Sequence, residues 1–145
     1  MIAVEITIQV ACPFSKREII RAVELAAQFE KKIASAVEIN IIGDRAIQTL
    51  NRRYRGLNKP TDVLSFSWNE DASFPSASLG QIYLSYPQIV RQARRFKVPP
   101  KEEFYRMLTH GLLHLVGYDH EQKAAAQKMF ALQEKILKKV ITFKK

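Results

Sequence analysis

The chain is 145 residues long and carries 23 Lys plus Arg against 14 Asp plus Glu, a formal net charge of +9. Hydrophobic residues make up 47% of the chain, which excludes a disordered polymer and allows one domain to bury a sizeable core. The single cysteine, Cys12, excludes an internal disulfide and a zinc site built on cysteine thiolates. The positive charge favours an anionic partner, nucleic acid ahead of an acidic membrane surface, although a basic protein without such a partner would have the same composition.

In the first half of the chain, predicted strands alternate with predicted helices. Residues 4–10 alternate between apolar and polar side chains and predict a strand, which Pro13 ends. Ser15, followed three residues later by Glu18, predicts the capping box of a helix that continues through Ala26. The other elements predicted in this half are a strand at 37–41, a helix from 44 to about 54, and a strand at 62–68.

The second half is predicted to be mainly helical. A segment rich in Ser and Asp at 69–79 predicts a long loop, and a short strand at 80–84 follows it. Helices are predicted at 85–96, from 100 to 116, and from 121 to about 140. Strands gather early and helices late, so we expect an α+β fold: a single domain over 1–145, with one mixed sheet of about four strands and helices packed on it.

No segment has the length and apolar character of a membrane span, and the N-terminus lacks the basic and apolar pattern of a signal peptide. We therefore expect a cytoplasmic protein without a membrane partner.

The three histidines of the chain all lie between positions 110 and 120. His110 and His114 are four residues apart in a predicted helix, so their imidazoles project from the same face. Gly117 can adopt the positive φ that ends a helix and reverses the chain, which would return His120 as a third ligand. Asp119 could accept the free N–H of a liganding histidine and fix its tautomer. Ordinary helix and loop histidines are the alternative, but the spacing equals that of the metzincin zinc proteases, and three histidine ligands leave a position open for water.

Gly111 stands where metzincins carry the glutamate that serves as general base. Without that carboxylate the usual proton shuttle of peptide hydrolysis is missing, so the site is predicted to be zincin-like in its ligands and different in its chemistry. RNA carries its own 2′-hydroxyl nucleophile, and cleavage of its phosphodiester needs charge stabilisation as much as proton transfer. We expect one zinc ion per chain, while nickel or another transition metal stays possible because imidazole binds several.

Two long segments resemble one protein family. Residues 110–120 are similar throughout to the H-G-x-L-H-L-x-G-Y-D-H signature of the YbeY family, bacterial metalloproteins that process RNA. Residues 50–66 resemble the family segment L-N-x-x-Y-R-G-x-x-K-P-T-D-V-L-S-F, and residues 129–134 give a weaker match. The order and spacing of these segments agree with the whole family domain.

The resemblance implies a single-strand-specific endoribonuclease that acts in ribosomal RNA maturation and ribosome quality control, with ribosomal RNA and the ribosome as partners and zinc on the three histidines. It also implies an essential arginine, which falls on Arg55. A guanidinium can hold a phosphate through two hydrogen bonds and stabilise charge that grows in the transition state. Without the resemblance, Arg55 would be interpreted as a surface charge. Gln81 departs from the family, which usually carries aspartate there; its amide can hydrogen-bond but carries no charge.

Basic residues around Arg55 are candidates for binding the RNA backbone, with solvated helix surfaces as the alternative. They are Arg52, Arg53 and Lys59. A second basic group consists of Arg91, Arg94, Arg95 and Lys97.

Tyr54 or Phe74 could stack on a base, although Tyr54 is expected to pack against the core. Two other functions stay open from the sequence. One is a metal-stabilised factor that binds RNA or the ribosome with little catalysis, and the other is a zincin-like hydrolase of another substrate.

Overall fold

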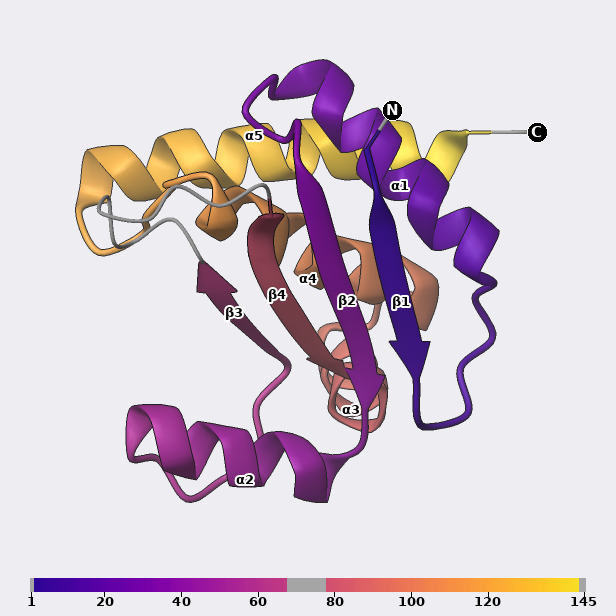
Figure 1. Cartoon of the computed structure of the whole chain (residues 1–145), viewed down its shortest axis with the longest axis vertical. Coiled ribbons are helices and arrows are strands. Elements are labelled where there is room, and N and C mark those ends of the chain that lie inside the picture. The colour runs from indigo at the N-terminus through magenta and orange to yellow at the C-terminus, as the bar shows by residue number, and fades with distance from the viewer. Residues whose placement is uncertain (1, 68–77, 144–145) are drawn as a thin grey trace.

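The computed structural model describes residues 2–67 and 78–143, and Figure 1 shows a sheet with helices packed on it. The α+β class predicted from the sequence is confirmed. The elements in chain order are β1 (Val4–Ile8), α1 (Lys16–Phe29), β2 (Ala36–Ile42), α2 (Asp44–Arg55), β3 (Val63–Ser67), β4 (Ser78–Ser85), α3 (Tyr86–Phe96), α4 (Pro100–Leu115) and α5 (Lys123–Thr142). None of the helices in the described part of the chain has the length and apolar character needed to cross a membrane.

The sheet has four strands in the order β1-β2-β4-β3 and is mixed, as expected. β1, β2 and β4 run parallel, whereas β3 pairs antiparallel with β4 and forms an edge. Ile39 on β2 lies between Ile6 on β1 and Ile82 on β4 in the register of the sheet. Side chains alternate between the two faces of a strand, so this register directs a row of branched apolar residues to one face.

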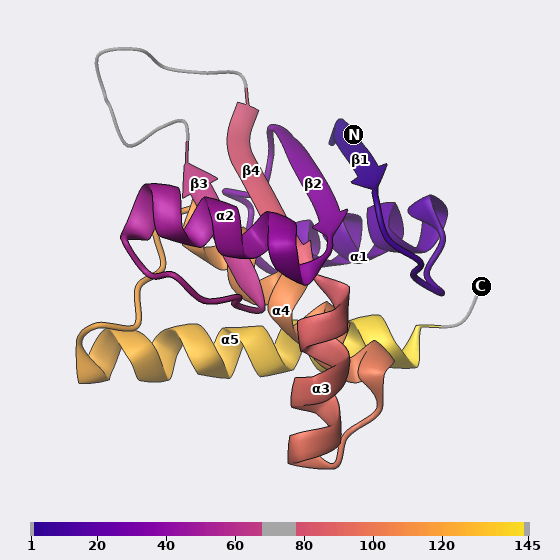
Figure 2. The same cartoon turned by 90° about the horizontal axis from the view of Figure 1, so that it is seen from below.

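The two faces of the sheet are covered unequally (Figure 2). One face packs against α1 and α4, with α5 lying against those two helices, and contains the main core, in which Ile39, Phe104 and Leu112 are fully buried. Among the described residues, the other face packs against α2, through a small cluster of three buried residues: Ile42, Ile47 and Leu64. The histidines of α4 therefore belong to the well-packed layer.

Element boundaries differ from the predicted ones by a few residues. Ser15 caps α1 as predicted, because its hydroxyl accepts the Glu18 backbone N–H at 3.1 Å. β1 ends at Ile8, since Gln9 donates the last hydrogen bond to β2 and the chain then leaves the sheet. β4 begins at Ser78, before the predicted start, because a shift in register between Ala36 and Val37 lets Ser78 pair with Ala36. Of the predicted loop at 69–79, residues 69–77 lie outside the described residues, as does Trp68 of the predicted third strand.

The expectation that Tyr54 packs against the core is wrong. Tyr54 is 60% exposed, and its ring meets only the edge of the sheet, at Phe66 with centroids 5.2 Å apart. The reason is the position of α2, whose C-terminal end extends past the edge strand β3 (Figure 1). Residues of this last turn therefore have little of the sheet to cover.

Candidate metal centre

Three histidines converge where α4 ends. His110 and His114 lie one turn apart on α4, and His120 lies in the segment between α4 and α5. One nitrogen from each ring can be chosen so that all three lie within 4.8 Å of one another. The Nε2 atoms of His110 and His114 are 3.1 Å apart, so these two nitrogens face a common point. The geometry is that of a group that could hold one metal ion.

Gly117 produces the reversal that brings His120 back. Its φ is +101°, a conformation that costs glycine little and other residues much. The Gly117 N–H donates to the His114 carbonyl at 3.1 Å, and the Tyr118 N–H donates to the Leu113 carbonyl at 3.0 Å. This pair of bonds is the Schellman arrangement that ends a helix with a glycine. The turn predicted at Gly117 is confirmed.

A buried amide orients the first histidine. The Nδ1 of His110 lies 2.7 Å from the side-chain oxygen of Gln133, which is 4% exposed. Because an amide oxygen only accepts, Nδ1 carries the proton and the lone pair of Nε2 faces His114. The other end of the amide donates to Glu134 at 3.2 Å, which keeps the oxygen turned toward the histidine.

From the sequence, this orienting role is predicted for Asp119. In the structure, Asp119 accepts the Glu121 backbone N–H at 3.0 Å. Its negative charge is close enough to raise the pKa of His114 slightly, against the larger effects that lower it. A hydrogen bond from Asp119 to a histidine stays a prediction. Gln133 was missed, although it lies in the weakly matching segment at 129–134.

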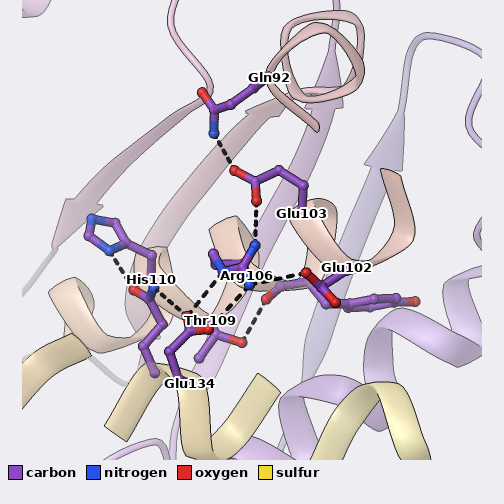
Figure 3. Close-up of polar contacts among 9 residues, drawn as sticks. Gln92, Glu102, Glu103, Arg106, Thr109, His110 and Glu134 are labelled. Atoms are coloured by element: carbon purple, nitrogen blue, oxygen red, sulfur yellow. Dashed lines mark hydrogen bonds and ion pairs between the residues drawn. The ribbon is translucent and has the colours of Figure 1, made fainter. Parts of the chain in front are cut away.

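The side-chain amide of Gln133 is connected to a network of ion pairs on the side away from His110 (Figure 3). Arg106 on α4 contacts Glu134 on α5 at 3.0 Å and Glu103 on its own helix at 2.6 Å. Glu103 is 1% exposed and also accepts a hydrogen bond from Gln92 on α3. Polar contacts thus run without a break from His110 to α3. A buried carboxylate requires such partners, because an unpaired one costs several kcal/mol.

The protonation of the two histidines on α4 suits metal binding. Burial, followed by the charges of His110 and His120, lowers the pKa of His114 to about 4. Burial also lowers the pKa of His110, against the opposing effect of Gln133. Both imidazoles are therefore neutral near pH 7, with a lone pair available for a metal ion.

At Gly111, α4 packs closely against the sheet. A Cβ at this position would lie 3.1 Å from Cγ2 of Ile82 and 3.4 Å from Cγ2 of Val63. The position that holds glutamate in metzincins is therefore occupied by packing against β3 and β4.

The predicted arginine lies on a different layer. Arg55 is the last residue of α2, on the opposite face of the sheet from α4, and is exposed. Within residues 2–67 and 78–143, no hydrogen bond or ion pair joins Arg55 to the histidines. In the segment after α2, the charge of Asp62 acts on the metal centre, where it raises the pKa of His110 slightly.

The other predicted RNA-binding residues are also exposed: Arg52, Arg53 and Lys59. In the second basic group, Arg91 is engaged in an ion pair with Asp44 at 2.8 Å. Gln81 donates to Glu38 on the neighbouring strand at 2.7 Å, on the face covered by α2 and away from the histidines. Phe74 lies outside the described residues.

A cleft of about 560 Å³ opens beside the metal centre. His114 and Leu115 of α4, Tyr118 of the turn, and Lys32 and Leu79 contribute to its lining. The cleft brings solvent, and so a substrate, to the edge of the histidine cluster.

An α+β domain with three convergent imidazoles beside an open cleft has the features of a metal-dependent hydrolase. The family described as Endoribonuclease YbeY matches residues 6–141. The chain belongs to this family of enzymes, as the resemblance of its motifs predicted.

Individual relatives support this assignment. The chain is 40% identical over 128 residues to an Endoribonuclease YbeY of Malacoplasma penetrans, covering 86% of this chain and 85% of the relative. It is 35% identical over 136 residues to one of Brevibacillus brevis, covering 84% of each. A Thermotoga maritima protein solved in solution is 27% identical, with a TM-score of 0.65 over 97% of this chain and 89% of that one.

Proposed function

We propose that residues 1–145 form one metal-dependent hydrolase domain, a single-strand-specific endoribonuclease that acts in the cytoplasm on ribosomal RNA, in its maturation and in ribosome quality control. The observation that carries the proposal is the convergence of one nitrogen from each of His110, His114 and His120 within 4.8 Å. Membership of an endoribonuclease family and the net charge of +9 support RNA as the substrate.

The three imidazoles would hold one zinc ion, or another transition metal such as nickel. A bound ion supplies Lewis acidity and lowers the pKa of a water molecule toward neutrality. Gln133 keeps the proton of His110 on Nδ1, so that Nε2 is always presented as the ligand atom.

Arg55 would bind a phosphate oxygen of the RNA through its guanidinium and stabilise charge in the transition state. Because position 111 is glycine and offers no carboxylate base, such charge stabilisation must contribute more to the rate. Arg52, Arg53 and Lys59 would hold the backbone of the strand on either side.

The test is cleavage of a single-stranded RNA by zinc-loaded protein, with His114→Ala alongside and the same sequence as a duplex for comparison. We expect the wild-type protein to cut the single strand and the variant to be inactive. Equal cleavage by the two proteins would show that the histidines are not involved, and binding without cleavage would favour a metal-stabilised RNA-binding factor.

Metal content provides an independent check on the ligands. Elemental analysis should find about one transition-metal ion per wild-type chain, as a three-histidine site implies. His120→Ala should lower that content sharply and leave the circular dichroism spectrum unchanged. Full metal content in His120→Ala would exclude His120 as a ligand.

A further inference from the structure

A partly exposed aromatic ring lies beside the histidines. Phe130 on α5 is 44% exposed, whereas its neighbour Met129 is fully buried and Gln133, three residues further on, is 4% exposed. α5 thus directs its apolar face to the core and leaves Phe130 at the border of that face, next to the metal centre.

The Phe130 ring faces two of the proposed ligands. It lies nearly parallel to the ring of His110, at 17° with centroids 6.2 Å apart, and its centroid is 6.4 Å from that of His120. The described part of the chain exposes five large hydrophobic side chains: Tyr54, Leu57, Phe96, Phe130 and Phe143. Among these five, Phe130 alone has a ring contact with the histidines.

A flat apolar ring in this position matches the chemistry of an unpaired nucleobase. Every base has a π-face that can stack on an aromatic side chain, whatever the sequence. Within a duplex, neighbouring base pairs cover those faces, whereas the bases of a single strand can turn outward and stack on protein. A nucleotide whose phosphate lies at the histidines would have its base one ribose away.

We propose that Phe130 is a stacking platform for one unpaired nucleobase beside the metal centre, and that this contact favours single-stranded over duplex RNA. The inference rests on the proposed ribonuclease function. It differs from the roles of Arg52, Arg53, Arg55 and Lys59, because those residues contact the backbone and a backbone contact does not by itself distinguish an unpaired base.

The alternative role of Phe130 is an apolar cover over the histidine rings. Phe130→Leu separates the two roles, because leucine keeps apolar bulk against the histidines and lacks a flat ring. Phe130→Tyr keeps the ring. Phe96→Leu is the matched control, since Phe96 is 59% exposed on α3 and has no ring contact with the histidines.

The measurement is single-turnover cleavage by zinc-loaded protein over a range of enzyme concentrations, with a set of single-stranded RNA 12-mers that each carry one 2-aminopurine. Loss of one stacked base should raise the half-saturating concentration of Phe130→Leu about 5- to 150-fold. Phe130→Tyr and Phe96→Leu should stay near wild type.

At one position in the set, 2-aminopurine fluorescence should be quenched on binding to wild type and not to Phe130→Leu. The ratio of cleavage of single-stranded RNA to cleavage of duplex RNA should be smaller for Phe130→Leu than for wild type.

An unchanged half-saturating concentration in Phe130→Leu, with quenching retained, would overturn the proposal. The proposal would also be overturned if Phe130→Leu lost zinc and regained wild-type RNA affinity once zinc was restored. That result would mean that Phe130 only covers the histidine rings. Failure of the ribonuclease function itself would appear separately, as wild type and His114→Ala behaving alike.

Discussion

The two faces of the sheet carry the two parts of the candidate site, and they are built differently. On the face of α4 and α5, His110 is held by a buried glutamine and, behind it, by the ion pairs of Arg106. On the face of α2, Arg55 projects into solvent from the last turn of a helix above a small core.

The difference follows from what each part must bind. A metal ion needs ligands that are in position before it arrives, since their geometry sets its affinity and its reactivity. A cation that binds a flexible strand can become ordered together with that strand. Changes in the buried network should therefore alter the stability of the fold and its affinity for metal. Changes in the exposed arginines should alter only the binding and cleavage of RNA.

The largest effect on the folded state is expected from Arg106→Met. This change leaves buried Glu103 and half-exposed Glu134 without their cation. Removing one partner of a buried pair costs about 3–5 kcal/mol, and partial exposure of Arg106 should reduce this to about 2–3 kcal/mol of the free energy of unfolding. Urea denaturation measures it. Arg91→Met, which breaks the exposed pair with Asp44, is the control and should cost less than about 1 kcal/mol. Equal losses of unfolding free energy in the two variants would show that the Arg106 network stabilises the fold no more than an exposed ion pair does.

Gln133→Leu tests the amide that orients His110. The variant removes the acceptor for the Nδ1 proton, and loss of such a partner typically lowers metal affinity about 10- to 100-fold. Competition with a zinc chelator gives the affinity directly. Gln133→Glu keeps an acceptor for that proton but loses the donor to Glu134, so we expect its zinc affinity to fall between those of wild type and Gln133→Leu. Asp119→Ala should change the affinity less than Gln133→Leu, and the reverse order would return the orienting role to Asp119.

Arg55→Lys keeps the charge and loses the two-pronged geometry of the guanidinium. We expect wild-type folding and zinc content, little change in RNA affinity, and single-turnover cleavage slower by about tenfold or more. Arg55→Glu should also weaken binding, since it opposes a negative charge to the backbone. If affinity falls in Arg55→Lys while the rate at saturation is unchanged, Arg55 is a docking residue only.

The smallest effect is expected from the double variant Arg52→Gln, Arg53→Gln. Each phosphate contact with a single strand contributes about 0.7 to the slope of log affinity against log salt concentration. The slope should therefore decrease by about 1.4, with metal content and unfolding unchanged. An unaltered slope would mean that these arginines only solvate the surface of α2.

Much of this architecture was predictable from the sequence because its signals are local. Alternating apolar residues gave the strands, Ser15 and Glu18 gave a helix start, and Gly117 gave the turn that returns His120. The errors arose where the outcome depends on distant parts of the chain. Tyr54 is exposed because the sheet ends at β3, and Gln133 meets His110 only because α5 packs on α4. Helix packing of this kind leaves no local pattern that a single sequence reveals.

Gly111 has a consequence for what this scaffold can become. Within the motif alone, one residue separates this site from the peptidase pattern, since only the glutamate is missing. In the folded protein a Cβ at 111 would lie 3.1 Å from Ile82 and 3.4 Å from Val63, so these side chains would have to shift to accommodate it. A protein engineer would therefore test the glutamate together with smaller residues at Ile82 on β4 and Val63 on β3.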